Sequence, residues 1–83
     1  MSFEECAEKL RQSESIVNGL DDAKKLEIYA LFKQGSVGDV NIDRPGMLDF
    51  KGKAKWDAWD AKKGMSQEEA QTAYVELVSE LLE

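Results

Sequence analysis

The chain has 83 residues, of which 42% are apolar and 34% charged, and its net charge at pH 7 is −6. This length predicts one domain over residues 1–83, and the acidic balance argues against nucleic-acid binding, which needs a cationic surplus. A single cysteine excludes an intrachain disulfide. The absence of histidine removes the commonest general base and metal ligand.

Sequence features that would direct the chain to a membrane or out of the cell are missing. No apolar run approaches the ~20 residues of a membrane-spanning helix. Residues 1–5 read MSFEE and are too acidic for a secretory signal. We therefore expect a cytoplasmic protein without stable membrane insertion.

The first predicted helix covers about residues 3–17. Ser2 followed three residues later by Glu5 has the spacing of a capping box, in which each residue satisfies a backbone N–H of the first turn. Apolar residues then recur at helical spacing. Asn18 and Gly19 can adopt the left-handed conformation that ends a helix.

The second and third predicted helices cover about residues 22–35 and 50–62. Asp21 or Asp22 can cap the second helix, which Gly35 is expected to end. The third is expected to begin after an aspartate cap at position 49 and to close near the glycine at position 64.

The fourth predicted helix, about residues 66–82, has the clearest pattern. Ser66 and Glu69 form a second capping box. Apolar residues follow at i, i+3, i+4, i+7, i+8 and i+11 and predict a single buried stripe: Ala70, Ala73, Tyr74, Leu77, Val78 and Leu81.

Residues 36–48 connect the second and third helices. A connection of this length is long for a helical bundle, where ~2–8 residues are usual. It contains apolar residues, among them Ile42, Met47 and Leu48. We expect an ordered overhand loop that packs on the bundle and allows the two helices to run parallel.

Cationic and aromatic residues mark a candidate ligand site. Lys51, Lys55 and Lys62 lie at i, i+4 and i+11, within about 40° on a helical wheel, and two tryptophans lie beside them. In the second helix, Tyr29 and Lys33 share one face. These residues suit a ligand with phosphates and a flat base. Spacing alone also fits a solvated lysine face beside core aromatic residues.

Metal binding and catalysis have weak support in the sequence. Asp39, Asn41 and Asp43 match the start of a calcium-binding loop, but Arg44 and Phe50 occupy the places of its glycine and its closing glutamate. We expect turn-forming hydrogen bonds there and no metal. The lone cysteine has no histidine to activate it. We therefore expect no catalytic residues, no cofactor and no enzyme activity.

Three ordered segments carry a more specific signal: YALFKQ at 29–34, VGDVN at 37–41 and RPGMLDFKGKAKWDAW at 44–59. Together they strongly resemble the acyl-CoA-binding protein family. The resemblance covers nearly the whole chain and is weakest in the first helix. It implies an all-α, four-helix bundle with up-down-down-up topology and the overhand loop between the parallel helices. It also implies a monomer that binds long-chain acyl-CoA and acts as an intracellular carrier and pool former.

The same resemblance implies roles for individual residues. Tyr29, Lys33 and Lys55 match family positions that hold the adenosine 3′-phosphate and nearby parts of the nucleotide. Lys51 matches a further contact on the basic helix. Tyr74 matches a tyrosine that contacts the adenine region, although its place on an apolar stripe also suits a core residue.

Two positions depart from the family pattern. Arg11 aligns with a lysine of the first helix that also reaches the ligand. Phe32 stands where many members carry tyrosine, so the ring is kept and any hydrogen bond from its hydroxyl is lost. The alternative interpretation of the chain is a helical protein-interaction module without a ligand.

Overall fold

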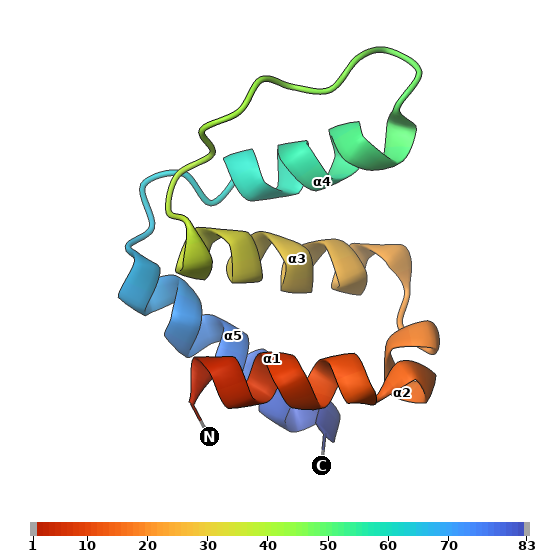
Figure 1. Ribbon diagram of the computed structural model, residues 1–83, viewed down its shortest axis with the longest axis vertical. Helices are drawn as coiled ribbons and strands as arrows, with labels where there is room; N and C mark the ends of the chain where they lie inside the picture. Colours follow the sequence, from red (N-terminus) through yellow and green to blue (C-terminus); the bar gives the residue numbers. More distant parts are fainter. Residues whose placement is uncertain (1, 83) are drawn as a thin grey trace.

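The protein is described by a computed structural model covering residues 2–82. These residues form five helices (Figure 1): α1 (Phe3–Gln12), α2 (Glu14–Asn18), α3 (Asp22–Ser36), α4 (Phe50–Asp60) and α5 (Gln67–Leu82). Helix α3 lies at the centre, packed against α4 on one side and α5 on the other, and α1 packs on α5. Helices α3 and α4 run in the same direction, whereas α1 runs opposite to α3. The predicted all-α fold with up-down-down-up topology is confirmed.

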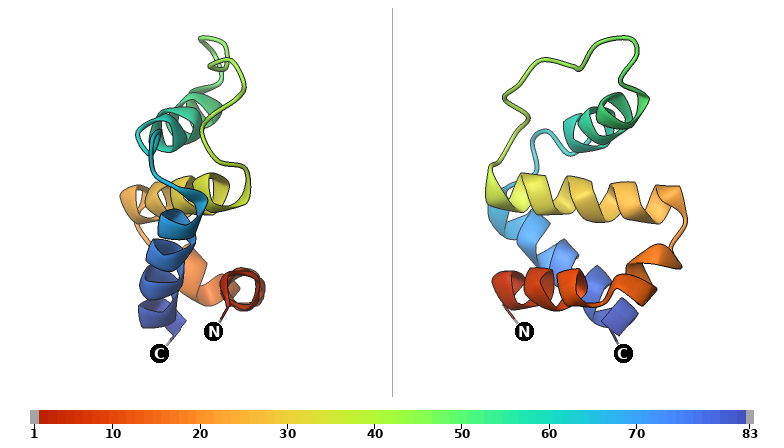
Figure 2. Two further views of the ribbon diagram at one scale, coloured as in Figure 1. Left: turned by 90° about the vertical axis from the view of Figure 1, so that its left-hand side faces the viewer. Right: turned by 45° about the vertical axis from the view of Figure 1, so that its right-hand side comes forward.

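Helix α5 crosses the molecule and packs against both α1 and α3 (Figure 2). The core lies where these three helices meet, and its buried members are Cys6, Leu10, Ile28, Leu31, Ala70, Tyr74 and Val78. The predicted stripe on α5 supplies three of them. Burial of these apolar side chains is the main stabilising contribution to a domain of this size.

The prediction of one continuous helix over residues 3–17 is wrong, because α1 ends at Gln12 and a separate short helix, α2, follows. Ser13 makes the break. Its hydroxyl donates to the carbonyl of Lys9 at 2.9 Å, and its own N–H turns to the carbonyl of Leu10 at 3.0 Å. A serine side chain that competes for backbone acceptors disfavours the regular helix. The break lets Val17 pack against the core.

Each predicted helix start is confirmed by a side chain that accepts a hydrogen bond from the first turn. Such a bond satisfies one of the backbone N–H groups that have no partner within the helix. The four pairs are Ser2 with Glu5 N–H (3.2 Å), Asp21 with Lys24 N–H (2.7 Å), Asp49 with Gly52 N–H (2.9 Å) and Ser66 with Glu69 N–H (3.0 Å).

Helix ends were predicted less well than helix starts. Gly19 has φ of −82° and does not adopt the left-handed conformation expected of it. Helix α3 continues through Gly35 to Ser36, and Gly38, with φ of +98°, makes the turn instead. Gly35 lies where α3 and α5 approach closely, because a Cβ there would lie 3.0 Å from the Cγ of Gln71 on α5. A larger residue at this position would require Gln71 to shift.

The overhand loop between α3 and α4 is ordered by hydrogen bonds to its backbone carbonyls. The indole N–H groups of Trp59 and Trp56 donate to the carbonyls of Gly38 at 2.8 Å and Ile42 at 2.7 Å. The ammonium of Lys53 donates to the carbonyl of Met47 at 2.9 Å. The expectation that the apolar side chains of the loop pack on the bundle is wrong: most of them, including Ile42, Met47 and Leu48, are exposed.

Candidate functional site

A pocket of about 700 Å³ opens between α1 and α2 on one side and α3 on the other. We call it the apolar pocket, because most of its wall is apolar or aromatic: Ala7, Leu10, Val17, Ile28, Tyr29, Phe32 and Tyr74. Polar side chains also line it: Arg11, Glu14, Asn18 and Lys25. This volume lies within the ~300–1,000 Å³ typical of ligand pockets.

Three aromatic rings from three helices pack together, and two of them, Phe32 and Tyr74, line the apolar pocket. Phe32 of α3 stacks on Phe3 of α1 with ring centroids 5.7 Å apart, and Tyr74 of α5 meets Phe3 edge-on at 5.1 Å. Burial raises the pKa of Tyr74, with a smaller contribution from Cys6. The phenol therefore stays protonated at neutral pH and can donate a hydrogen bond.

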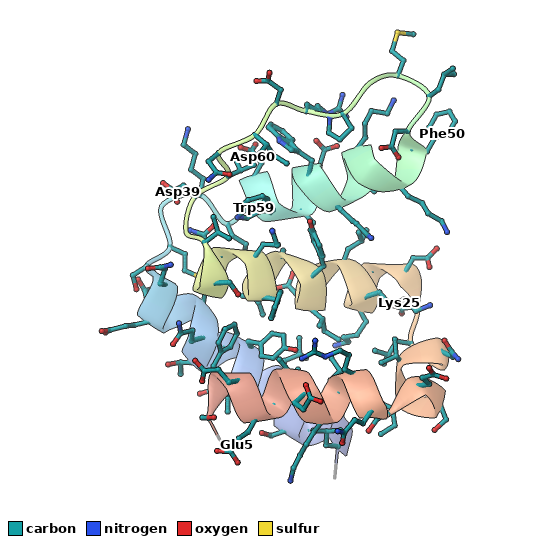
Figure 3. The ribbon with its side chains drawn as sticks, in the orientation of Figure 1. Glu5, Lys25, Asp39, Phe50, Trp59 and Asp60 are labelled. Atoms are coloured by element: carbon teal, nitrogen blue, oxygen red, sulfur yellow. The ribbon has the colours of Figure 1, made fainter. Side chains whose placement is uncertain are left out.

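A second pocket of about 430 Å³ lies between the first turns of α3 and α4. We call it the lysine pocket, since three lysines line it together with apolar and acidic neighbours: Lys25, Lys51 and Lys55, with Asp22, Leu26, Phe50 and Ala54. Figure 3 shows Lys25 near the α2 end of α3 and Phe50 at the start of α4. Ammonium groups at such a site suit phosphate oxygens.

The two pockets adjoin over α3. Lys25 lines both of them. The ring of Tyr29, which lines the apolar pocket, faces the ammonium of Lys55 from the lysine pocket at 5.4 Å. One turn further along α3, the ammonium of Lys33 lies 5.0 Å from the centre of the Trp59 ring. An amphipathic molecule could therefore place an apolar part and an anionic part side by side across this helix.

The predicted site residues fall into three groups. Arg11, Tyr29, Phe32 and Tyr74 line the apolar pocket. Lys51 and Lys55 line the lysine pocket. Lys33 lines neither pocket, and its ammonium lies over the Trp59 ring, one turn along α3 from Tyr29. The side chain of Arg11 is also engaged on the surface, where it pairs with Glu8 at 2.6 Å.

One lysine was placed wrongly by the sequence and another was missed. Lys62 does not extend the stripe of α4, because the helix ends at Asp60 and the Lys62 ammonium pairs with Glu27 of α3 at 2.6 Å. Lys25 was missed, although it stands four residues before Tyr29 and so shares its face of α3. That spacing was the available signal.

The aspartate that begins the calcium-like segment has a structural role. The Oδ1 atom of Asp39 accepts from Gln34 Nε2 and from the Gly64 N–H, both at 2.9 Å. The bond from the Gly64 N–H, followed by that from Gln34, holds the pKa of Asp39 below its ordinary value. Gln34 is buried and also donates to the carbonyl of Met65 at 2.7 Å. Asp39 and Gln34 therefore tie the overhand loop to the turn between α4 and α5.

Residues 2–82 lack two further features, a metal-binding cluster and a membrane-spanning helix. No cluster of three or more potential metal-binding side chains occurs there. None of the helices in that range combines the length and hydropathy that a membrane crossing requires.

Comparison with known proteins gives concordant matches. The family model described as acyl CoA binding protein matches residues 1–78. Acyl-CoA-binding protein homolog 1 of Caenorhabditis elegans is 49% identical over 82 residues, covering 99% of this chain and 92% of the relative. The crystal structure of Oryza sativa acyl-CoA-binding protein 2 superimposes with a TM-score of 0.86 at 42% identity, over 96% of this chain and 86% of the other. A Moniliophthora perniciosa structure of the same family gives 0.86 at 43% identity, over 96% and 76%.

Proposed function

Since the chain belongs to the acyl-CoA-binding protein family, we propose that it binds long-chain acyl-CoA thioesters across the two adjoining pockets and carries them in the cytoplasm. The observation that supports this assignment most directly is the apolar pocket of about 700 Å³ lying beside a group of lysines on α3 and α4. An acyl-CoA has the same two characters, a long alkyl chain and a polyanionic nucleotide.

The alkyl chain supplies the larger part of the driving force in this proposal. Burying one methylene gains roughly 0.8 kcal/mol, so a sixteen-carbon chain gains on the order of 10 kcal/mol before costs. Ordering the ligand and the side chains that touch it removes several kcal/mol of that gain. The apolar wall formed by Leu10, Val17 and Ile28 is the surface we assign to the chain.

The nucleotide supplies class specificity. We assign its phosphates to Lys33, Lys51 and Lys55, through charge-assisted hydrogen bonds from ammonium groups. Tyr29 lies between these lysines and the apolar pocket, and its ring can contact the base or the ribose. In this arrangement the nucleotide lies over the alkyl chain and shields it from water. Arg11, Phe32 and Tyr74 complete the wall on the α1 and α5 side.

Binding and release, without chemical conversion, is the activity we propose. Cys6 is fully buried among apolar neighbours, where a thiol behaves as a small hydrophobic group. The core of α1, α3 and α5 is completed within one chain, which favours a monomer. A carrier of this kind can also hold a pool of bound ligand.

Calorimetric titration with palmitoyl-CoA, with CoA and palmitate as separate controls, tests the proposal. We expect one-to-one binding of the thioester and much weaker binding of both fragments, because each fragment fills only one of the two pockets. If none of the three ligands gives a binding signal, the protein does not bind acyl-CoA. A helical protein-interaction module then becomes the better interpretation.

A further inference from the structure

The parallel helices α3 and α4 face each other through pairs of side chains that keep one register. The ring of Tyr29 faces the ammonium of Lys55 at 5.4 Å, and the ammonium of Lys33 lies 5.0 Å from the centre of the Trp59 ring. The two members of each pair are separated by the same number of residues in the chain. Because both helices advance in the same direction with the same rise per residue, this register predicts which side chains face each other one turn earlier.

One turn before Tyr29, the register pairs two lysines. Lys25 of α3 and Lys51 of α4 have the same separation in the chain, and both line the lysine pocket. In the other two pairs an ammonium meets an aromatic ring, whereas here two ammonium groups share one pocket. Asp22 also lines this pocket, yet within residues 2–82 neither lysine forms an ion pair. Like charges in one pocket repel each other, and an anion bound between them is attracted to both. The pocket therefore suits an anion.

The lysine pair is well separated from Lys33, the other cation that α3 presents to α4. Lys25 and Lys33 are eight residues apart, which corresponds to about 12 Å along the helix axis. The nucleotide of CoA likewise carries two separate anionic groups. One is the 3′-phosphate on the ribose, and the other is the pyrophosphate between the ribose and the pantetheine arm. Two cationic positions along α3 thus match two anionic groups of the ligand.

The position of Lys25 indicates which of the two groups it meets. Lys25 lines both the lysine pocket and the apolar pocket, to which we assign the acyl chain, whereas Lys33 lines neither (Figure 3). Along the covalent structure of an acyl-CoA, the pyrophosphate is the anionic group nearer to the acyl chain. A lysine can pack its apolar stem along one wall while its ammonium reaches a polar neighbour.

We infer that Lys25, with Lys51 on the facing helix, binds the pyrophosphate of the ligand at a site separate from that of the 3′-phosphate. This inference rests on the proposed function and deepens it, because it divides recognition of the nucleotide into two parts. A CoA thioester without its 3′-phosphate keeps the contact with Lys25 and loses only the contact with Lys33.

Calorimetric titration with dodecanoyl-CoA and with dodecanoyl-3′-dephospho-CoA tests the inference. The second ligand lacks the 3′-phosphate and keeps the pyrophosphate. Lys25→Gln removes the charge but keeps most of the apolar stem, so contacts of the stem with either pocket are retained. We expect this variant to bind both ligands about fivefold more weakly than wild type, because a charge-assisted bond to the pyrophosphate is lost with each. Lys33→Gln should weaken binding of dodecanoyl-CoA only.

The matched control is Lys24→Gln, which removes the same charge from an exposed position that lines neither pocket. Its affinity for both ligands should stay within about twofold of wild type, since distant exposed charges are screened by salt. Lys25→Gln that binds both ligands as tightly as this control would overturn the inference. A loss confined to dodecanoyl-CoA would also overturn it, because Lys25 would then contact the 3′-phosphate.

Two further outcomes are distinct. If Lys33→Gln weakens both ligands to the same extent as Lys25→Gln, the nucleotide has one anionic subsite, and the proposed separation is wrong. Wild-type protein that binds neither ligand would instead contradict the proposed function.

Discussion

The two sides of α3 differ in what they contact. Toward α5 and α1, the helix buries Ile28 and Leu31 in the core, and Gly35 permits close backbone approach. Toward α4, it presents Tyr29 and Lys33, which are only partly buried. Within the described residues, Trp59 is the one fully buried side chain of α4. Stability is thus concentrated on the α1 and α5 side of α3, and the lysines assigned to the nucleotide lie on the α4 side.

This difference means that substitutions on the two sides should have separable effects. Loss of an apolar side chain on the α5 side should lower the free energy of unfolding. Loss of a charge on the α4 side should lower affinity for the ligand and leave the fold nearly unchanged, because partly exposed charges contribute little to stability.

The largest expected effect is that of Leu31→Ala. Leu31 is buried in the core and lines neither pocket. Removal of its side chain should lower the free energy of unfolding by about 3 kcal/mol, from lost burial and the cavity left behind. Urea unfolding followed by tryptophan fluorescence measures the change. The control Lys51→Ala, on the exposed side of α4, should stay within about 0.5 kcal/mol of wild type. Equal destabilisation by both would contradict the proposed division.

Lys33→Ala should have the next largest effect, and on affinity. We expect palmitoyl-CoA binding to weaken by more than ~1 kcal/mol, because a charge-assisted bond to a phosphate is lost. Stability should fall by no more than about 1 kcal/mol, the contribution of its contact with the Trp59 ring. Isothermal titration measures the first quantity and thermal unfolding the second.

The matched control for Lys33→Ala is Lys24→Ala, which removes the same charge from an exposed position on α3 that lines neither pocket. Equal losses of affinity in the two variants would show that only the net charge of the protein matters. Unchanged affinity in Lys33→Ala would remove this lysine from the site.

Phe32→Tyr should have a smaller effect in the opposite direction. Phe32 lines the apolar pocket and is 38% exposed, so an added hydroxyl can reach the bound nucleotide or water. One additional hydrogen bond should tighten binding by about threefold. Titration of both proteins with palmitoyl-CoA under identical salt conditions measures it. Weaker binding would mean that the hydroxyl is forced against the Phe3 and Tyr74 rings instead.

The smallest expected effect concerns the stability of the fold at acid pH and depends on Asp39 in the overhand loop. The pKa of Asp39 is lowered in the folded protein, so ionised Asp39 stabilises the fold above the unfolded pKa of 3.8, and this contribution is lost as the pH falls below that value. Asp39→Asn can still accept both hydrogen bonds but cannot titrate. Its unfolding temperature should therefore fall less than that of wild type between about pH 5 and pH 2. The control Asp43→Asn, in the same loop, should follow wild type.

Local interactions explain most of what could be predicted from the sequence. Helix starts were predicted correctly at Ser2, Asp21, Asp49 and Ser66, because a cap is formed by residues three positions apart. The buried stripe of α5 was also predicted, since its period reports burial on one side. The resemblance to the family gave the topology and the candidate site residues, all of which except Lys33 line one of the two pockets.

Helix breaks and exposed apolar residues could not be predicted in the same way. Ser13 ends α1 through bonds to Lys9 and Leu10, yet a serine at that position is compatible with a continuing helix. Met47 and Leu48 were expected to pack on the bundle but are exposed, because hydropathy reports the side chain and not its surroundings.

The sequence by itself determined the helical segments, their capped starts, the buried stripe of α5 and the chemical types that suit an acyl-CoA. The tertiary structure decided which of those residues meet. It placed Lys25 between the two pockets, paired Lys62 with Glu27 and left Met47 and Leu48 of the overhand loop exposed. The physical reason is the range of the interactions: caps and periodicity act within a few residues, whereas pockets and ion pairs between helices depend on how distant segments pack.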